Sequence, residues 1–343
     1  MADKKMFFDR MEVLLDGDSK YVKKLPVGRG VKYVIFSDFH LGDGSHADNF
    51  RQNESVVCKA LKHYRENGYS VVLLGDIEEF HQMTLYPIML KYDGTVYQGL
   101  RDFTDKRLYR VFGNHDIDWA LEDPLFAQSR TTSLEAILLG DHVVLTHGHQ
   151  AREPYEKDLH VVRFGTTFFR FVENFIGSSE GSTVTSTPSE KDAIYADWAR
   201  ENKKILVCGH THNPISASRS MFEWIGLRLG QIEKALGQGQ VTPTDKKALK
   251  DERLWLRNKQ KWMQDKLTTM KTSVIKLTVP GYFNSGGCIY HDGITNVEID
   301  GTAIQLVYWN NKRERRETIW DGKDMNVIIN ELNGTSGRSY IGG

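Results

Sequence analysis

Cysteine is scarce in this sequence. Only Cys58, Cys208 and Cys288 occur among its 343 residues, and no two of them form a CxxC pair. Domains that depend on disulfides carry many closely spaced cysteines, so a disulfide framework is not expected here. The same scarcity fits a protein that folds in a reducing compartment.

Long apolar runs are also missing. No segment approaches the roughly 20 consecutive apolar residues that a membrane-spanning helix requires. The first ten residues, Met1 to Arg10, are charged and contain no apolar stretch of signal-peptide length. We therefore expect a cytoplasmic protein without a transmembrane segment, and peripheral contact with a membrane surface stays open as an alternative.

Neither sign of charge is in excess, because 45 basic residues balance 45 acidic ones. This balance argues against a protein that holds nucleic acid by its overall charge. One segment, Lys246 to Lys271, is locally basic, with nine Lys or Arg against three Asp or Glu. A solvated helix face is the favoured interpretation, with nucleic acid or an anionic membrane surface as alternative partners.

The length of the chain and its pattern of apolar residues predict an α/β fold. A chain of 343 residues allows one large domain with insertions, or two domains. Short apolar runs bounded by turn residues indicate buried strands, and helical stretches such as Glu54 to Asn67 lie between several of them. The predicted strands are Tyr33 to Ser37, Val71 to Leu74, Leu108 to Phe112, Val143 to Thr146 and Ile205 to Cys208.

One region that interrupts this pattern runs from Gln150 to Lys204. A phenylalanine stripe there has helical spacing, which favours a packed core face over an acyl-binding pocket. The stripe consists of Phe164, Phe168, Phe171 and Phe175. The Ser/Thr-rich segment that follows, Ser178 to Ser189, is typical of a mobile loop.

A second region, residues 217–272, is predicted to be a helical hairpin inserted into the α/β domain. Two apolar stripes with helical spacing flank a Gly-Gln-Gly break, and Thr242 and Pro243 suit the start of the second helix. The hairpin would divide the main domain into residues 1–216 and 273–343. Four more strands are predicted at 274–279, 288–290, 295–299 and 303–308, and the Gly-rich end, 334–343, is expected to be disordered.

Each of the five predicted strands is followed by residues that can bind a metal ion. In order, they are Asp38 and His40, Asp76, Asn114, His147, and finally His210 and His212. In open α/β sheets, ligands gather at the carboxyl ends of the strands. Residues two apart on an extended strand end point the same way, which suits both the DxH and the HxH pairs. The glycines beside Asp76, Asn114, His147 and His210 would let the backbone turn sharply there.

Any one of these signals has an ordinary structural explanation. A single histidine after a strand is usually a surface or core residue, and GNHD alone fits a capped turn. Five such signals in one order indicate a dinuclear site instead. Two divalent ions about 3.5–4 Å apart can clamp a phosphoester and activate the water between them. Such a site needs imidazoles, hard carboxylates and one carboxylate shared by both ions.

The motifs DFH, GDIEE, GNHD, THGH and GHTH resemble those of the calcineurin-like metallophosphoesterase superfamily over about residues 33–214. The resemblance implies a four-layer α/β/β/α sandwich, and the helical hairpin predicted from its apolar stripes would be a cap inserted into it. It implies that Asp38, His40, Asp76 and His212 hold one metal. The second metal would be held by Asp76, Asn114, His147 and His210, so that Asp76 bridges the two.

The same resemblance implies a catalytic role for His115, near the oxygen of the leaving group. Asp116 is expected to orient His115, with Glu79 as the alternative. The cofactors implied are two divalent ions, with Mn²⁺ expected and Fe, Zn or Ni as alternatives. A hydroxide formed between the ions would attack phosphorus, while His115 stabilises the developing charge and protonates the leaving group.

Within the superfamily, the chain looks most like the UDP-2,3-diacylglucosamine pyrophosphohydrolase branch. The similarity lies in DFHLG, in GHTHNP and in Tyr282-Phe-Asn284-Ser-Gly286. It implies a small or lipid-linked phosphoester substrate, such as a UDP-sugar lipid or a nucleotide. The chain departs from that branch at His115, where arginine is common, at His149, where aspartate is common, and in its extra hairpin.

Two alternative functions remain, a metal-dependent nuclease and a binding scaffold that has lost catalysis. The basic segment supports a nuclease, but the overall charge does not. The presence of every ligand type together with His115 argues against the scaffold. His46, His81 and His149 lie near the motif ends, where ordinary polar roles are favoured over contact with substrate. No feature of the sequence indicates an oligomeric state.

Overall fold

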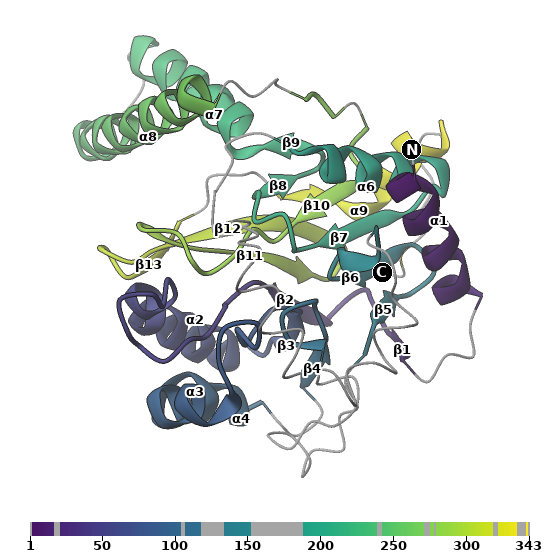
Figure 1. Cartoon of the computed structure of the whole chain (residues 1–343). Helices are drawn as coiled ribbons and strands as arrows, with labels where there is room; N and C mark the ends of the chain where they lie inside the picture. The colour runs from purple at the N-terminus through teal and green to yellow at the C-terminus, as the bar shows by residue number, and fades with distance from the viewer. Residues whose placement is uncertain are drawn as a thin grey trace.

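The computed structural model describes residues 2–16, 21–103, 107–117, 134–151, 188–238, 242–270, 275–277, 279–317, 322–334 and 341. Two β-sheets face each other, and helices cover the outer face of each sheet (Figure 1). This arrangement confirms the predicted α/β class and the four-layer α/β/β/α sandwich.

The helices of the described residues lie on both outer faces of the sandwich and at one corner, and the last of them packs against the core between the sheets. The α-helices are α1 (Ala2–Leu15), α2 (Glu54–Glu66), α3 (Leu85–Tyr92), α4 (Gln98–Arg101), α6 (Glu190–Glu201), α7 (Met221–Gly237), α8 (Pro243–Met270) and α9 (Met325–Asn333). Three short helical turns join them: η1 (Arg51–Asn53), η2 (Asp93–Tyr97) and η5 (His149–Ala151).

The first sheet has the strand order β1-β5-β6-β7-β10-β8-β9. Its strands are β1 (Val22–Leu25), β5 (Ala136–Leu139), β6 (Val143–Thr146), β7 (Ile205–Cys208), β8 (Ile215–Ser216), β9 (Arg219–Ser220) and β10 (Tyr282–Asn284). Within it, β6, β7 and β10 run parallel, so their carboxyl ends lie at one edge.

The second sheet has the order β13-β12-β11-β2-β3-β4, with β14 paired to β12. Its strands are β2 (Lys32–Phe36), β3 (Ser70–Leu74), β4 (Leu108–Val111), β11 (Gly293–Asp300), β12 (Ala303–Asn310), β13 (Arg315–Glu317) and β14 (Lys323–Asp324). Here β2, β3 and β4 run parallel, and they too end at a common edge.

The alternation of side chains along each strand explains how the sheets pack against each other and against the helices. On β2, Tyr33 and Ile35 point to the opposite sheet, whereas Val34 and Phe36 point to the cluster that contains α2, α3 and α4. On β7, Val207 joins the core between the sheets, while Leu206 packs with α1 and α6. Because successive side chains point to opposite faces, a strand with a continuous apolar run can bury both of its faces.

The predictions for individual elements were largely confirmed. The five strands that precede the predicted ligands lie within one residue of their predicted bounds. The helix α2 begins at the predicted residue and ends one residue before the predicted end. The predictions at 295–299 and 303–308 correspond to β11 and β12. The strand predicted at 288–290 is wrong, because the backbone N–H of Cys288 donates to the Asp38 carbonyl at 3.0 Å instead of joining a sheet.

Other predicted segments are wrong or lie beyond the described chain. The part of 274–279 that the structure describes contains no strand. The phenylalanine stripe at 164–175 and the loop from 178 up to 187 lie outside the described residues, as does most of the C-terminal segment 334–343. None of the described helices is both long enough and apolar enough to cross a membrane.

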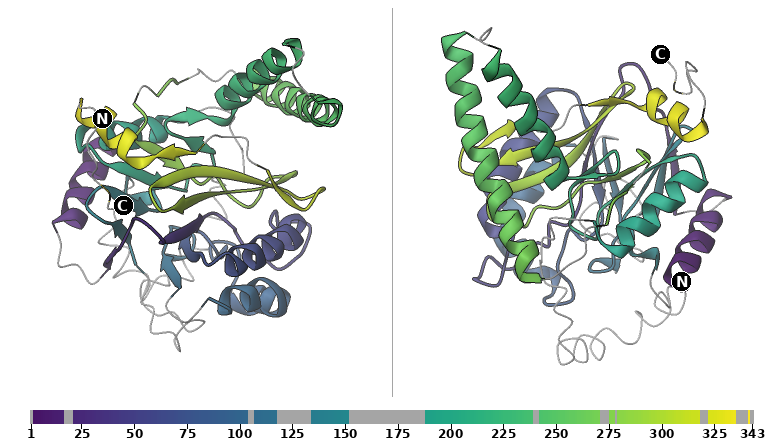
Figure 2. Two further views of the ribbon diagram at one scale, coloured as in Figure 1. Left: turned by 180° about the vertical axis from the view of Figure 1, so that it is seen from behind. Right: turned by 90° about the horizontal axis from the view of Figure 1, so that it is seen from above.

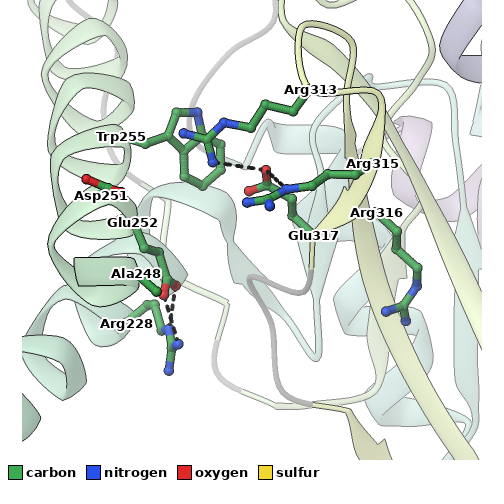
Figure 3. A pocket seen from close by; sticks show the side chains of 9 residues that line it. All are labelled: Arg228, Ala248, Asp251, Glu252, Trp255, Arg313, Arg315, Arg316 and Glu317. Carbon is green, nitrogen blue, oxygen red and sulfur yellow. Dashed lines mark hydrogen bonds and ion pairs between the residues drawn. The ribbon is translucent and has the colours of Figure 1, made fainter. Parts of the chain in front are cut away.

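The helices α7 and α8 lie side by side and project from one corner of the sandwich (Figures 1 and 2). Their inner residues, including Ile225 and Leu256, continue the apolar core between the sheets. An ion pair of 2.8 Å joins Lys259 of α8 to Asp292, just before β11. A cleft of about 800 Å³ separates α8 from β13, and it is lined by four arginines and three acidic residues (Figure 3).

Candidate metal centre

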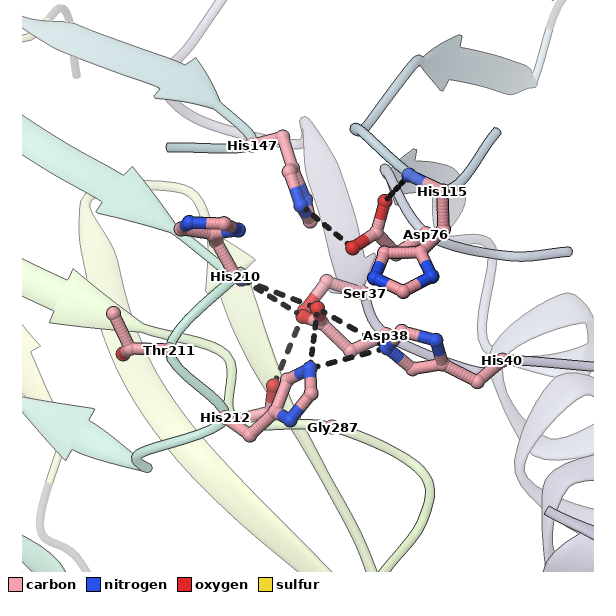
Figure 4. A network of polar contacts seen from close by, with 12 residues as sticks. Ser37, Asp38, His40, Asp76, His115, His147, His210, Thr211, His212 and Gly287 are labelled. Atoms are coloured by element: carbon pink, nitrogen blue, oxygen red, sulfur yellow. Dashed lines mark hydrogen bonds and ion pairs between the residues drawn. The ribbon is translucent and has the colours of Figure 1, made fainter. Parts of the chain in front are cut away.

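The parallel strands of both sheets bring the predicted ligands together at one edge of the sandwich (Figure 4). Asp38, Asp76 and Asn114 follow β2, β3 and β4, and His147 and His210 follow β6 and β7. The His147 Nδ1–H donates to the Leu74 carbonyl at 2.8 Å, so a ligand loop of one sheet is bonded to a strand of the other.

Three groups of side chains that could hold a metal form at this edge among the described residues, and within each the ligand atoms lie within 4.8 Å of one another. The first is Asp38, His40 and His212, the second is Asp76, His147 and His210, and the third is His40, Glu79 and His115. In the first group, His212 Nε2 lies 3.1 Å from Asp38 Oδ1. In the second, His147 Nε2 lies 3.0 Å from Asp76 Oδ2. The first two groups correspond to the two implied ligand sets, apart from Asn114 and the sharing of Asp76.

A buried polar atom at this edge lacks a hydrogen bond. Among the described residues, no hydrogen-bond partner reaches Asn114 Oδ1. Leaving such an atom unsatisfied costs about 1–3 kcal/mol, and native structures rarely do so without a reason. A divalent cation would satisfy it. Carboxylate oxygens, an amide oxygen and imidazole nitrogens together suit Mn²⁺, Fe²⁺ or Zn²⁺.

Five of the seven predicted ligands have a left-handed backbone. They are Asp38, His40, Asp76, His210 and His212, with φ between 49° and 66°. A residue with a side chain is strained there by roughly 1–3 kcal/mol, and such strain clusters at functional sites. The prediction that DxH and HxH are extended is therefore wrong. Each pair converges on the site through left-handed residues.

Two of the glycines are required because a carboxylate packs against their backbone, and not because the backbone turns there. Gly113 and Gly209 do not have positive φ, but a Cβ at either position would overlap the carboxylate of Asp76 or Asp38, respectively. Gly75 does adopt a positive φ, at 87°, and a Cβ there would meet the ring of His147. Glycine at these positions thus lets two strand ends approach the ligand carboxylates.

Glu79 holds the ring of His115. Glu79 Oε1 accepts a hydrogen bond of 2.7 Å from His115 Nδ1, and Glu79 Oε2 accepts one of the same length from His40 Nδ1. Glu79, which the sequence left as the alternative to Asp116, is therefore the residue that orients His115. The expectation that Asp116 orients His115 is wrong. One carboxylate links a predicted metal ligand with the predicted catalytic histidine.

Asp116 instead joins the two loops that carry Asp76 and Asn114. Its carboxylate is fully buried, accepts hydrogen bonds from the backbone N–H groups of Ile77 at 2.8 Å and Gly113 at 2.6 Å, and pairs with Arg110 at 3.1 Å. Arg110 also pairs with the buried Glu78. Asp116 therefore fixes the spacing of the ligand loops without touching His115.

Electrostatics favour a protonated His115. Burial alone would lower the pKa of His115, but the charge of Asp76 and the hydrogen bond to Glu79 outweigh it and raise the pKa to about 9. His147 behaves similarly, since burial lowers its pKa while Asp76 raises it to about 9. Burial opposes ionisation of Asp76, yet the neighbouring histidines hold its pKa well below the ordinary value.

A buried network that the sequence did not reveal supports the GHTH loop. Asp192, at the start of α6, accepts hydrogen bonds from Thr211 Oγ1 at 2.7 Å and from Asn213 Nδ2 at 3.0 Å. Asn284 Nδ2 donates to the Gly209 carbonyl at 2.7 Å. The Ser189-x-x-Asp192 capping box is a sequence signal that could have located the start of α6.

The remaining histidines near the motifs have different surroundings. His81 stacks on His115 with 4.0 Å between the ring centres. His46 contacts Arg51 at 3.1 Å. His149 is buried beside His147, and burial lowers its pKa to about 3, so it is neutral at physiological pH. Of the three, only His81 contacts a predicted catalytic side chain.

Comparisons with known proteins agree with this architecture. The family model described as the calcineurin-like phosphoesterase superfamily domain matches residues 31–240. A search of curated proteins finds no match. Seven chains of solved structures match; one is vacuolar protein sorting 29 from Cryptosporidium parvum, at 14% identity and a TM-score of 0.35, over 87% of this chain and 99% of that one. Since the family model spans more than half of its length, the chain belongs to the calcineurin-like phosphoesterase superfamily.

Proposed function

We propose that this protein hydrolyses a phosphoester or pyrophosphate bond with the help of two divalent metal ions. The observation that carries the proposal is the pair of ligand groups at one edge of the sandwich. The orphaned Asn114 Oδ1 and the strained ligand backbone support the same proposal, because unsatisfied buried acceptors and strained residues cluster at functional sites.

Each proposed ion has a set of side chains to hold it. Asp38, His40 and His212 would hold the first ion, and Asn114, His147 and His210 would hold the second, with Asp76 shared. Mn²⁺ is the proposed metal because the set mixes hard oxygens with imidazoles. When bound, the two ions would lower the pKa of a water between them and offset charge on the phosphoryl oxygens.

His115 and Glu79 supply the proton chemistry. The His115 Nδ1–H donates to Glu79, so Nε2 is the ring atom that can give a proton to the substrate. As water adds to phosphorus and the ester bond breaks, the leaving oxygen takes the Nε2 proton of His115 and departs as a neutral alcohol, and the proton released by the attacking water restores the charged ring. Glu79 keeps the ring oriented and favours its charged form.

The substrate and the role of the hairpin are also proposals. We propose a small or lipid-linked phosphoester, and the nearer similarity to the UDP-2,3-diacylglucosamine pyrophosphohydrolases stays a prediction. Residues 1–216 and 273–343 would form the catalytic domain, with residues 217–272 as a cap. The hairpin follows the His210 and His212 loop after the two short strands β8 and β9, which supports a role in substrate access.

Replacement of Asp76 tests this function. Asp76→Ala removes the carboxylate assigned to both ions, so bound Mn²⁺ should fall and hydrolysis of bis(p-nitrophenyl) phosphate should drop at least about 10³-fold. Asp300→Ala, at an exposed strand end, is the matched control and should keep wild-type metal content and rate. Near-wild-type turnover of Asp76→Ala at saturating Mn²⁺ would contradict the proposal, as would an inactive, metal-loaded wild-type protein.

A further inference from the structure

Lys191 places a positive charge against the predicted metal ligands. Its Nζ lies 3.1 Å from His210 Nε2, and the side chain is partly buried. Among the residues that the structure describes, no carboxylate pairs with Lys191, and His210 is its recorded hydrogen-bonding partner. An ammonium group beside an imidazole, without an acid to balance it, is an unusual arrangement for a structural lysine.

The backbone of Lys191 is held at a fixed position relative to the ligand loop. Lys191 lies in the first turn of α6, next to the fully buried Asp192. The Asp192 carboxylate accepts hydrogen bonds from Thr211, between the two histidines of GHTH, and from Tyr282 of β10 at 2.8 Å. The capping box with Ser189 fixes the same turn. The Lys191 ammonium group can move by rotation about the side-chain bonds, but the backbone of this turn is held in place.

A metal ion on His210 removes the partner of Lys191. If the ion binds Nε2, the lone pair of that atom is taken. If the ion binds Nδ1, the neutral ring carries its proton on Nε2 and cannot accept a hydrogen bond. Lysine has only donors, so it cannot bind the metal while charged. In the loaded protein, Lys191 therefore needs an acceptor near the second ligand group.

We propose that Lys191 binds a negatively charged oxygen of the substrate beside the Asp76–His147–His210 group, and so selects substrates with a second negative charge at the phosphoryl end. The proposal rests on the proposed function, since it takes the reacting phosphate to lie at this edge. The substrates favoured are phosphomonoesters and pyrophosphates over phosphodiesters.

Charge balance supports this choice of substrate. Two divalent ions, with Asp38 and Asp76 as their carboxylate ligands, retain about two positive charges. Lys191 adds a third. A phosphodiester offers one negative charge and leaves Lys191 unmatched. A monoester or pyrophosphate offers an additional anionic oxygen, for which a charge-assisted hydrogen bond from lysine is the suited partner.

Substitution of Lys191 in the Mn²⁺-loaded full chain tests the proposal. Lys191→Met should weaken the binding of inorganic phosphate, measured by calorimetry, by about 10- to 100-fold. It should lower kcat/KM for p-nitrophenyl phosphate to a similar extent, and that for bis(p-nitrophenyl) phosphate less than about threefold. Lys191→Arg should recover most of the phosphate affinity. Lys62→Met, on the exposed face of α2, is the control and should change neither quantity.

Two results would overturn the proposal. In the first, Lys191→Met binds phosphate as tightly as the wild type; if it also binds Mn²⁺ more tightly, Lys191 only occupies the metal position in the empty protein. In the second, both substrates lose activity equally. A wild type that hydrolyses neither substrate refutes the proposed function, but its phosphate titration still decides the role of Lys191.

Discussion

Single carboxylates at the metal centre have separate tasks that their neighbours define. Glu79 bonds to two histidines, whereas Asp116, adjacent to His115 in the sequence, points to two backbone N–H groups and an arginine. Adjacent residues in a tight turn point in different directions, so sequence proximity is a poor guide to contact. Glu79 is far from His115 along the chain, but β3 and β4 pair and bring their loops together.

His115 should act on the leaving group and leave metal binding intact. His115→Ala removes the proposed proton donor, so we expect a fall in rate of about 10²–10⁴-fold, with unchanged Mn²⁺ content. The loss should be smallest for 4-nitrophenol esters, whose leaving group departs without a proton, and larger for alkyl esters. Rates across a series of leaving groups, together with metal analysis, measure both effects. Loss of one ion from the variant would show that His115 is a ligand.

At the scale of elements, the ends of strands decide where the ligands lie. The sequence predicted five of these ends because each strand is a short apolar run that stops at a polar residue. The left-handed backbone of Asp38, Asp76 and His210 could not be predicted in this way. It arises from bonds across the sheet edge, such as that from the Asp38 N–H to the Gly75 carbonyl at 3.0 Å.

The strand β10 and the start of α6 escaped prediction for a related reason. Tyr282–Asn284 has only three residues, too few for a periodic pattern, and the more apolar 288–290 was favoured. Asp192 and Lys191 belong to α6, whose buried positions include an aspartate and two alanines and therefore give a weak apolar pattern. Nothing in their local sequence indicates that they reach the GHTH loop. Their importance depends on tertiary contacts that single-sequence patterns do not contain.

Asp116 should act through the two loops that it joins. Asp116→Asn retains an acceptor but removes the charge that faces the buried Arg110, so we expect a loss of about 1–3 kcal/mol in the free energy of unfolding. Urea denaturation measures this loss. The folded variant should keep the wild-type dependence of rate on the leaving group, because His115 is still held by Glu79. If the rate of Asp116→Asn depends on the leaving group as that of His115→Ala does, Asp116 is the residue that orients His115 and the prediction is wrong.

At the scale of the whole molecule, the sandwich and the hairpin share one apolar core. Met221, Ile225 and Leu256 belong to the same cluster as the facing surfaces of the two sheets. Trp255 packs near Tyr308 of β12, and the Lys259–Asp292 pair closes the junction with side chains that are 9% and 17% exposed. Removal of the entire segment 217–272 would uncover this junction, so the base of the hairpin has to be kept in any test of its function.

The outer part of the hairpin can be removed beyond the ion pairs that join its two helices. Arg228 pairs with Glu252 at 2.8 Å, and Glu233 pairs with Arg257 at 2.6 Å, so a short Gly/Ser linker can replace residues 234–251. The junction residues Trp255, Leu256 and Lys259 remain in this variant. If the hairpin is a cap, hydrolysis of a small phosphodiester should persist within about tenfold, whereas activity on a large anionic substrate should collapse, because remote binding energy is lost.

Salt dependence separates the two ways in which the hairpin could contact such a substrate. Lys246, Lys250 and Lys261 lie exposed along α8, so a substrate held by them should bind more weakly to the intact protein as ionic strength rises. A substrate held by the apolar junction would respond little to salt. The comparison uses kcat/KM of the intact and shortened proteins at low and high salt, with urea denaturation of both as the control for folding. If the shortened protein is folded but loses activity on small and large substrates alike, the hairpin is needed for the catalytic centre itself and is not a cap.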